Sequence, residues 1–117
     1  MNIESYFNYC LKLPGTTEEF PFDDKTLVFK VQGKMFTLTD VDTFESINLK
    51  CDPDRAIIFR DMYEEIIPGY HMNKKHWNAV KMNGSLSDEL IFELIDHSYE
   101  LVKAKLPKKL KDALDNP

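Results

Sequence analysis

Hydrophobic residues recur along this chain with two different periods, and each period predicts one kind of secondary structure. Over residues 3–13 they come at steps of three and four, the spacing of an amphipathic helix. A longer stripe of the same spacing predicts a second helix over residues 87–106. Asn2 is placed to cap the first helix, and Ser85 or Ser87 the second. Each helix therefore has one apolar face to bury.

Between these helices the apolar positions alternate, which predicts an antiparallel sheet. Its strands are expected over residues 26–31, 34–39, 46–51 and 77–82. Gln32-Gly33 joins the first two strands as a hairpin turn. The alternation assigns Phe36 and Leu38 to an apolar face that helices cover. The opposite, polar face then carries Lys30, Thr37, Thr39, Asn48 and Lys50.

A third helix is expected to run from Pro53 until Pro68-Gly69 ends it. Residues 16–24 are expected to form a loop, and the lysine-rich tail over 108–117 to be frayed. The chain over 1–117 is therefore predicted to be a single domain of the α+β class. Its sheet is antiparallel, with helices packed on one face.

Composition fits a folded protein without a membrane-spanning segment. The chain has 117 residues, of which 43% are hydrophobic and 12% aromatic, enough for one modest core. No apolar stretch reaches the roughly 18 residues that a membrane helix needs, and the first residues lack the pattern of a signal peptide. Cys10 and Cys51 follow no redox or metal-binding spacing, so both are expected to be reduced, buried thiols of a cytoplasmic protein.

The charge is negative overall but unevenly distributed. A formal net charge of −5 opposes non-specific nucleic-acid binding. Two stretches without an acid nevertheless gather lysines, the first holding Lys74, Lys75 and Lys81, the second Lys103, Lys105, Lys108, Lys109 and Lys111. Cations near the end of the last helix complement the helix dipole, so the second stretch has a structural explanation without any ligand.

The most informative segment is Pro68-Gly69-Tyr70-His71-Met72-Asn73-Lys74-Lys75-His76-Trp77. It combines a turn signal with cationic, amide and aromatic side chains, and it contains no acid. Lysines can meet phosphates, and an exposed aromatic ring can stack a base. The same residues also fit a structural turn that packs Tyr70 and Trp77 inward and leaves the lysines in solvent. Composition alone does not choose between the two.

Signatures of catalysis and of metal binding are lacking in the sequence. It contains no glycine-rich phosphate loop, nucleophile elbow or H-E-x-x-H pair. His71 and His76 are five residues apart, a spacing that places them on one face of neither a helix nor a strand. Four acids within 18–24 could hold a hard cation, but they match no calcium loop and fit a solvated loop better. We therefore expect a non-enzymatic protein without a cofactor or a metal ion.

The chain resembles the MmcQ/YjbR family of small bacterial proteins over nearly its whole length, most specifically at residues 68–77. The other matching segments are Leu13-Pro14-Gly15, Pro21-Phe22, Phe29-Lys30-Val31, Gly33-Lys34-Met35-Phe36, Leu49-Lys50-Cys51, Ser98-Tyr99-Glu100-Leu101-Val102 and Leu106-Pro107-Lys108-Lys109. The resemblance implies a CyaY-like (frataxin-like) fold, with helices on one face of an antiparallel sheet. It also implies DNA binding through a "double wing" arrangement, whereas similarity of fold to frataxin does not confer iron binding.

Two functions of different classes follow as hypotheses. The first is a DNA-binding or regulatory protein whose site is formed by Lys34, Tyr70, His71, Asn73, Lys74, Lys75, His76 and Trp77. In it lysines contact phosphates, the amide and the imidazoles add hydrogen bonds, and an aromatic ring stacks a base. The alternative is a module that binds a protein partner or a small ligand through the polar face of the sheet. An exposed aromatic beside the lysines favours the first, and a buried Trp77 with a deep apolar pocket favours the second.

Overall fold

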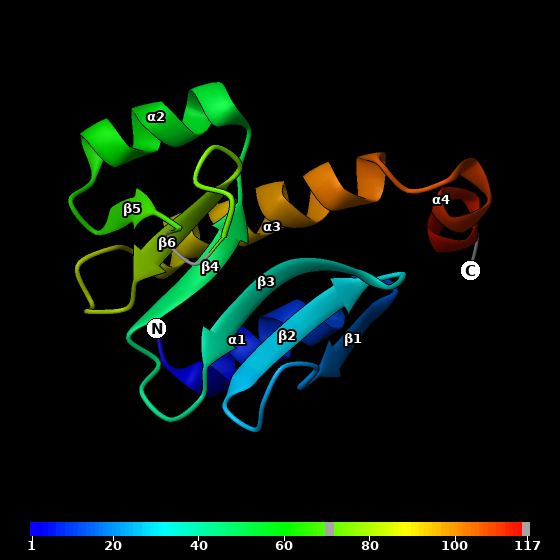
Figure 1. Ribbon diagram of the computed structural model, residues 1–117, viewed down its shortest axis with the longest axis horizontal. Helices are drawn as coiled ribbons and strands as arrows, with labels where there is room; N and C mark the ends of the chain where they lie inside the picture. Colours follow the sequence, from blue (N-terminus) through cyan, green and yellow to red (C-terminus); the bar gives the residue numbers. More distant parts are fainter. Residues whose placement is uncertain (70–71, 116–117) are drawn as a thin grey trace.

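The computed structural model describes residues 1–69 and 72–115, which form one sheet and four helices (Figure 1). The helices are α1 (Ile3–Lys12), α2 (Pro53–Met62), α3 (Asp88–Ala104) and α4 (Lys108–Asp115). The strands are β1 (Thr16–Glu19), β2 (Thr26–Val31), β3 (Lys34–Asp40), β4 (Ser46–Lys50), β5 (Ile66–Pro68) and β6 (Trp77–Lys81). They lie in the order β1-β2-β3-β4-β6-β5, and every neighbouring pair is antiparallel. The predicted α+β class with an antiparallel sheet is confirmed.

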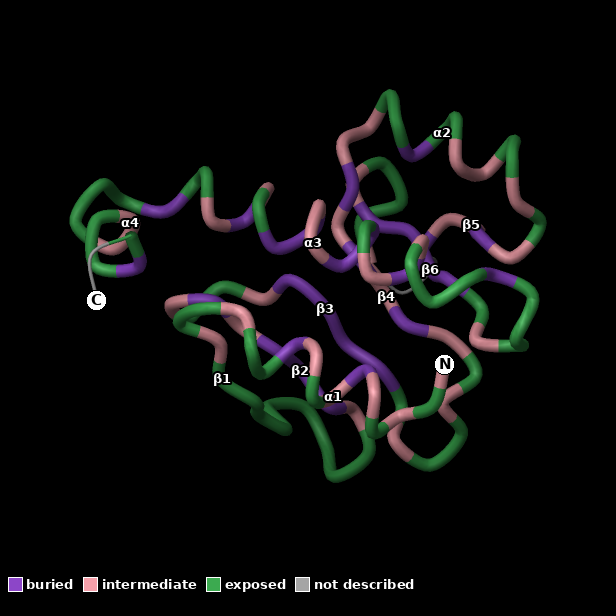
Figure 2. Tube along the Cα trace, turned by 180° about the vertical axis from the view of Figure 1, so that it is seen from behind, coloured by how far each residue is buried: buried purple, intermediate pink, exposed green. Residues whose placement is uncertain are grey.

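Helices α1 and α3 lie on one face of the sheet and enclose the main core with it (Figures 1 and 2). Tyr9 of α1 stacks on Phe92 of α3, with 4.1 Å between the ring centroids. Both predicted caps are present: Asn2 accepts a backbone N–H at 2.8 Å, and Ser87 accepts one at 3.2 Å. Between helices and sheet are buried Tyr6, Phe29, Phe36, Ile47 and Ile95.

A β-bulge in β3 changes which side chains face these helices. Phe29 of β2 pairs with Thr37, but the next residue, Lys30, pairs with Met35. Phe36 is therefore an extra residue in β3, and the alternation of faces is broken there. Phe36 and Thr37, although consecutive, are both fully buried on the helix-covered face.

The predicted division of β3 between the two faces is therefore wrong. Leu38 lies on the uncovered face, whereas Thr37 and Thr39 lie on the covered face at 0% and 2% exposure. These hydroxyls are tolerated because β4 supplies acceptors for them. Thr37 donates to the carbonyl of Asn48 at 2.9 Å, and Thr39 donates to the carbonyl of Ser46 at 2.8 Å.

The β3–β4 junction is the shortest ladder in the middle of the sheet. Its register covers three residue pairs, against six between β2 and β3 and five between β4 and β6. Where the ladder stops, Ser98 of α3 bridges the two strands. Its hydroxyl donates to the carbonyl of Phe36 at 2.5 Å and accepts the N–H of Lys50 at 2.9 Å. A helix side chain thus completes the pairing that the strands do not make themselves.

The two edge strands, β1 and β5, lie where the sequence predicts a loop and the end of a helix. Thr16–Glu19 was expected to be a loop, because it shows no apolar alternation, yet it pairs with β2 as the polar edge strand β1. Glu19 there meets the ammonium of Lys30 at 2.6 Å. The predicted third helix ends earlier than expected, since α2 stops at Met62 and the residues from Ile66 form β5.

The C-terminal tail is also ordered, in contrast to the predicted fraying. Residues Lys108–Asp115 form α4, whose Leu114 is buried against Gly15. Gly15 has a φ of +75°, which residues with a side chain rarely adopt, and a Cβ atom there would lie 2.2 Å from Leu114 Cδ2 and displace that side chain. Asp115 accepts from the ammonium of Lys103 at 2.9 Å. Residues 116–117 of the predicted tail lie outside the described residues.

Both cysteines are free and buried, as predicted. Burial raises the pKa of the Cys10 thiol and that of the Cys51 thiol, so both favour the unreactive protonated form. In the parts of the chain that the structure describes, no helix is long and apolar enough to cross a membrane.

Candidate functional site

Asn73 stabilises the conformation of the loop that precedes β6. Asn73 Oδ1 accepts the N–H of Lys75 at 2.9 Å. The carbonyl of Asn73 accepts the N–H groups of His76 at 3.1 Å and Trp77 at 2.9 Å. The Asn73 side chain, predicted to contact a ligand, thus stabilises the turn through one of its two polar atoms.

Arg60 of α2 holds the same loop from outside. Its Nε donates to Asn78 Oδ1 at 2.7 Å, and its guanidinium also donates to the carbonyls of Lys74 and Trp77. The side chains of Lys74 and Lys75 are exposed. Sequence patterns give no signal for Arg60, because its partners lie 14 to 18 residues away along the chain.

Trp77 is a packing residue of the uncovered sheet face. It is only 6% exposed and forms a small cluster with Val28, Leu38 and two half-buried methionines. The turn before it fits closely, since a Cβ atom at Gly69 would lie 3.0 Å from the Cβ of Trp77. In this conformation the ring offers little surface for base stacking, and this burial is the observation that favours the alternative of a partner- or ligand-binding module. Tyr70 and His71, the other predicted members at this position, lie outside the described residues.

A pocket of about 350 Å³ opens beside this tryptophan, where β3, β4 and the end of α3 meet. It is lined by Lys34, Met35, Lys50, Trp77, Val102 and Lys105. Lys34 begins β3, Lys50 ends β4, and Lys105 follows the last residue of α3. The bulge and the Ser98 bridge lie at the same place, since Ser98 binds the backbone N–H of Lys50. The end of the short β3–β4 ladder therefore places three lysines around one hollow.

The electrostatics of this pocket favour an anion. Within the described residues, no acid lines it, and Lys34, Lys50 and Lys105 form no ion pair. Burial lowers the pKa of Lys50, and the nearby charge of Lys105 lowers it further. The Lys50 ammonium also lies 5.9 Å from the centroid of the Trp77 ring. An anion in the pocket would relieve the repulsion between these lysines.

The structure brings together only part of the predicted site. Lys34 and Trp77 line one pocket, and Lys74 and Lys75 are exposed on the loop that leads to Trp77. His76 is half-buried, and its carbonyl accepts the N–H of Cys51 at 2.8 Å. Sequence patterns do not predict Lys50 and Lys105 as site residues. The alternation places Lys50 on the polar face of the sheet but gives it no role there. The helix dipole already explains a lysine at the position of Lys105.

His97 of α3 supports the start of α2. Its Nε2 accepts the N–H of Asp52 at 3.2 Å, and its Nδ1 lies 3.1 Å from a guanidinium nitrogen of Arg55. Burial lowers the pKa of His97, and Arg55 lowers it further against an opposing effect of Asp52. If His97 were protonated, its Nε2–H would face the backbone N–H of Asp52, and the hydrogen bond between them would be lost. The imidazole is thus a structural acceptor for α2.

We expect His97→Gln to weaken the pH dependence of stability on the acidic side of neutrality. The folded pKa of His97 is lowered, so its contribution is complete above the unfolded pKa of about 6.5 and is lost as the pH falls below it. The free energy of unfolding, measured in urea at about pH 7 and about pH 5, should differ less in the variant than in the wild type. Equal pH dependence in the two proteins would contradict this role.

Comparisons with known proteins give consistent matches. A protein-family model described as YjbR matches residues 11–101. The uncharacterized protein YjbR of Escherichia coli (strain K12) is 31% identical over 115 residues, which cover 97% of this chain and 98% of that protein. The uncharacterized protein YbdF of Escherichia coli O157:H7 is 40% identical over 101 residues, covering 86% of this chain and 83% of that protein. The crystal structure of Deinococcus radiodurans protein DR2400 superposes with a TM-score of 0.91 and 40% identity, covering 99% of this chain and 89% of that one.

Proposed function

This chain belongs to the YjbR family, and we propose that it is a non-enzymatic nucleic-acid-binding protein with a regulatory role in the cytoplasm. Phosphate groups occupy the lysine-lined pocket in this proposal. The observation that carries it is a hollow lined by Lys34 of β3, Lys50 of β4 and Lys105 just after α3, with no acid among the described residues of its lining. Placement in the cytoplasm agrees with two cysteines that remain thiols.

Each lysine has a distinct part in this proposal. Lys34 and Lys105 are exposed and flexible, so they follow phosphates as point charges. Lys50 is half-buried against the Trp77 ring and gives the pocket a fixed charge. Lys74 and Lys75 extend the cationic surface along the backbone of the nucleic acid. Trp77 forms a wall of the pocket and supports Lys50, which replaces the base-stacking role that the sequence suggested.

The protein carries a net charge of −5, so nucleic-acid binding depends on the local lysine-rich surface around the pocket. Most of the protein repels a polyanion, so only a surface with an excess of lysines can meet one. Phosphate contacts carry no base information, and binding through these lysines is therefore expected to show little sequence preference.

The test is a salt titration of DNA binding by a variant with Lys34→Gln and Lys105→Gln. Removing two phosphate contacts should flatten the slope of log K against log salt by roughly 1.8 units on duplex DNA, at about 0.9 per contact. Binding is measured by the fluorescence anisotropy of labelled single- and double-stranded oligonucleotides. Affinity should fall by a similar factor for every sequence.

The matched control is Lys25→Gln with Lys81→Gln. It changes the net charge equally, but Lys25 and Lys81 lie at the opposite end of the sheet. The control should keep the wild-type slope. Equal slopes in the two double variants would show that the pocket lysines do not contact DNA. Absence of DNA binding by the wild type at low salt would reject the proposed function.

A further inference from the structure

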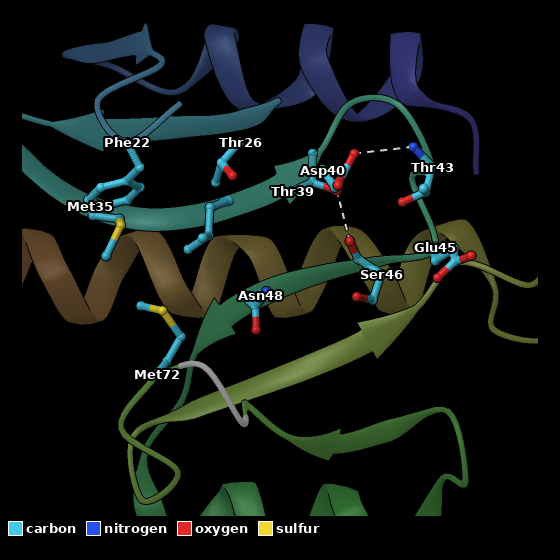
Figure 3. A pocket seen from close by; sticks show the side chains of 11 residues that line it. Phe22, Thr26, Met35, Thr39, Asp40, Thr43, Glu45, Ser46, Asn48 and Met72 are labelled. Carbon is cyan, nitrogen blue, oxygen red and sulfur yellow. Dashed lines mark hydrogen bonds between the residues drawn. The ribbon is translucent and has the colours of Figure 1, made fainter. Parts of the chain in front are cut away.

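We propose that the uncovered face of the sheet holds a binding site for a small organic cation with an apolar body. This site adjoins the lysine-lined pocket, with which it shares Met35 as a wall, and it goes beyond the proposed nucleic-acid binding. A half-open cavity of about 540 Å³ lies over β3 and β4, between the loop that contains Phe22 and the loop that follows β3 (Figure 3). We refer to it as the open-face cavity.

One end of the open-face cavity is apolar. Phe22, Met35 and Met72 gather there, and the two thioether side chains approach each other (Figure 3). Phe22 is 67% exposed, which is unusual for so large an apolar ring and leaves it available to cover a ligand. Methionine side chains are flexible and adapt to ligands of different shape. This end therefore fits the apolar body of a small molecule.

The other end carries negative charge. Asp40 and Glu45 lie there beside Thr43 and Ser46 (Figure 3), and no lysine or arginine is among the described residues that line the cavity. The Asp40 carboxylate is fixed in place, because its Oδ1 accepts the N–H of Asp42 at 2.8 Å and that of Thr43 at 3.3 Å. Its second oxygen makes no hydrogen bond to a described residue. A fixed carboxylate without a cation is a binding group for an ammonium ion.

Glu45 and Asn48 complete the polar lining. Among the described residues, the Glu45 carboxylate forms no ion pair, although Lys81 lies opposite the adjacent Ser46 in the sheet. The side-chain amide of Asn48 lies between the apolar and the acidic ends (Figure 3) and hydrogen-bonds to no described side chain or backbone group. It offers a donor and an acceptor at mid-length. The lining thus matches an elongated molecule with an apolar end and a cationic end.

The experiment compares three probes that share one apolar body. These are 2-phenylethylammonium, the neutral 2-phenylethanol and the anionic 3-phenylpropionate, each titrated into the full chain and followed by amide ¹H–¹⁵N chemical shifts. The cation should perturb residues 38–48 in a saturable way and bind about tenfold more tightly than the alcohol, a ratio that corresponds to one charge-assisted contact. The anion should not saturate these sites.

The variant Asp40→Asn with Glu45→Gln should bring the affinities for cation and alcohol to within about twofold. The amides keep the shape of the cavity but remove the negative charge that attracts the ammonium group. The amide that replaces the Asp40 carboxylate keeps an oxygen for the turn, so folding should be retained. Asp54→Asn with Asp61→Asn, two exposed acids of α2, removes equal charge and should keep the tenfold preference. Equal binding of cation and alcohol by the wild type, or saturable shifts only outside the cavity, would overturn the proposal.

Failure of this proposal is distinguishable from failure of nucleic-acid binding. The variant with Lys34→Gln and Lys105→Gln should bind 2-phenylethylammonium with wild-type affinity, since neither lysine lines the open-face cavity. A loss of cation binding in that variant would show that the cavity is not an independent site. Met35 is the one described residue that lines both pockets, so it is left unchanged in every variant.

Discussion

Replacing Trp77 with alanine is expected to lower the free energy of unfolding by about 3–5 kcal/mol, the range for removing a large buried aromatic ring. Trp77 is 6% exposed and fills the space between Val28, Leu38 and the methionines on the uncovered face. Its backbone is held by Gly69 and Arg60, so the surrounding chain has little freedom to close the cavity. The loss should therefore fall inside this range and not near zero.

Urea unfolding followed by far-ultraviolet circular dichroism measures this effect. Fluorescence is unsuitable for the variant, because the chain has a single tryptophan. Phe22→Ala is the matched control, since this ring is 67% exposed and its loss should change stability by within about 0.5 kcal/mol. A loss of less than about 1 kcal/mol in Trp77→Ala would contradict the packing role of the ring.

Ser98→Ala should cost roughly 2–4 kcal/mol, although it removes a single oxygen atom. The hydroxyl satisfies the carbonyl of Phe36 and the N–H of Lys50, and the serine is fully buried. Each buried backbone group left without a partner costs about 1–3 kcal/mol. A water molecule entering the vacated space would recover part of that loss. The variant should also weaken DNA binding, because the Lys50 backbone loses its attachment to α3.

The comparison variant for Ser98 is Ser85→Ala, which removes an exposed serine hydroxyl. It should change the free energy of unfolding by within about 0.5 kcal/mol in the same urea titration. If the two serine variants were equally stable, the bridge would contribute nothing to holding β3 and β4 together. If Ser98→Ala lost stability but bound DNA with the wild-type salt slope, Lys50 would be placed by the sheet alone.

Local sequence patterns predicted the elements whose own residues carry a strong signal. β2 begins and ends at the predicted residues, and Asn2 and Ser87 cap α1 and α3 as expected. β1 was missed because an edge strand of polar residues shows no alternation. The faces of β3 were misassigned because the bulge at Phe36 is stabilised from outside the strand, by a serine 62 residues further along the chain.

The same distinction explains what was found of the candidate site. Lys34 and Trp77 belong to segments with a recognisable pattern, and both line the pocket. Lys50 and Lys105 join it only through tertiary structure, at the places where a strand and a helix end. Asn73 was recognised as polar, but its hydrogen bonds within the turn depend on the conformation of the loop.

The ladder between β3 and β4 holds the two halves of the sheet together by three residue pairs, and α3 packs against both of these strands. Strands β1 to β3 lie on one side of this ladder, and β4, β6 and β5 lie on the other. Folded proteins open locally where few backbone pairs hold two parts together. Lys34 lies in β3 and Lys50 in β4, so an anion held by both would link the two halves and oppose local opening between them by mass action. Occupancy of the pocket and resistance of the protein to partial unfolding would then rise together.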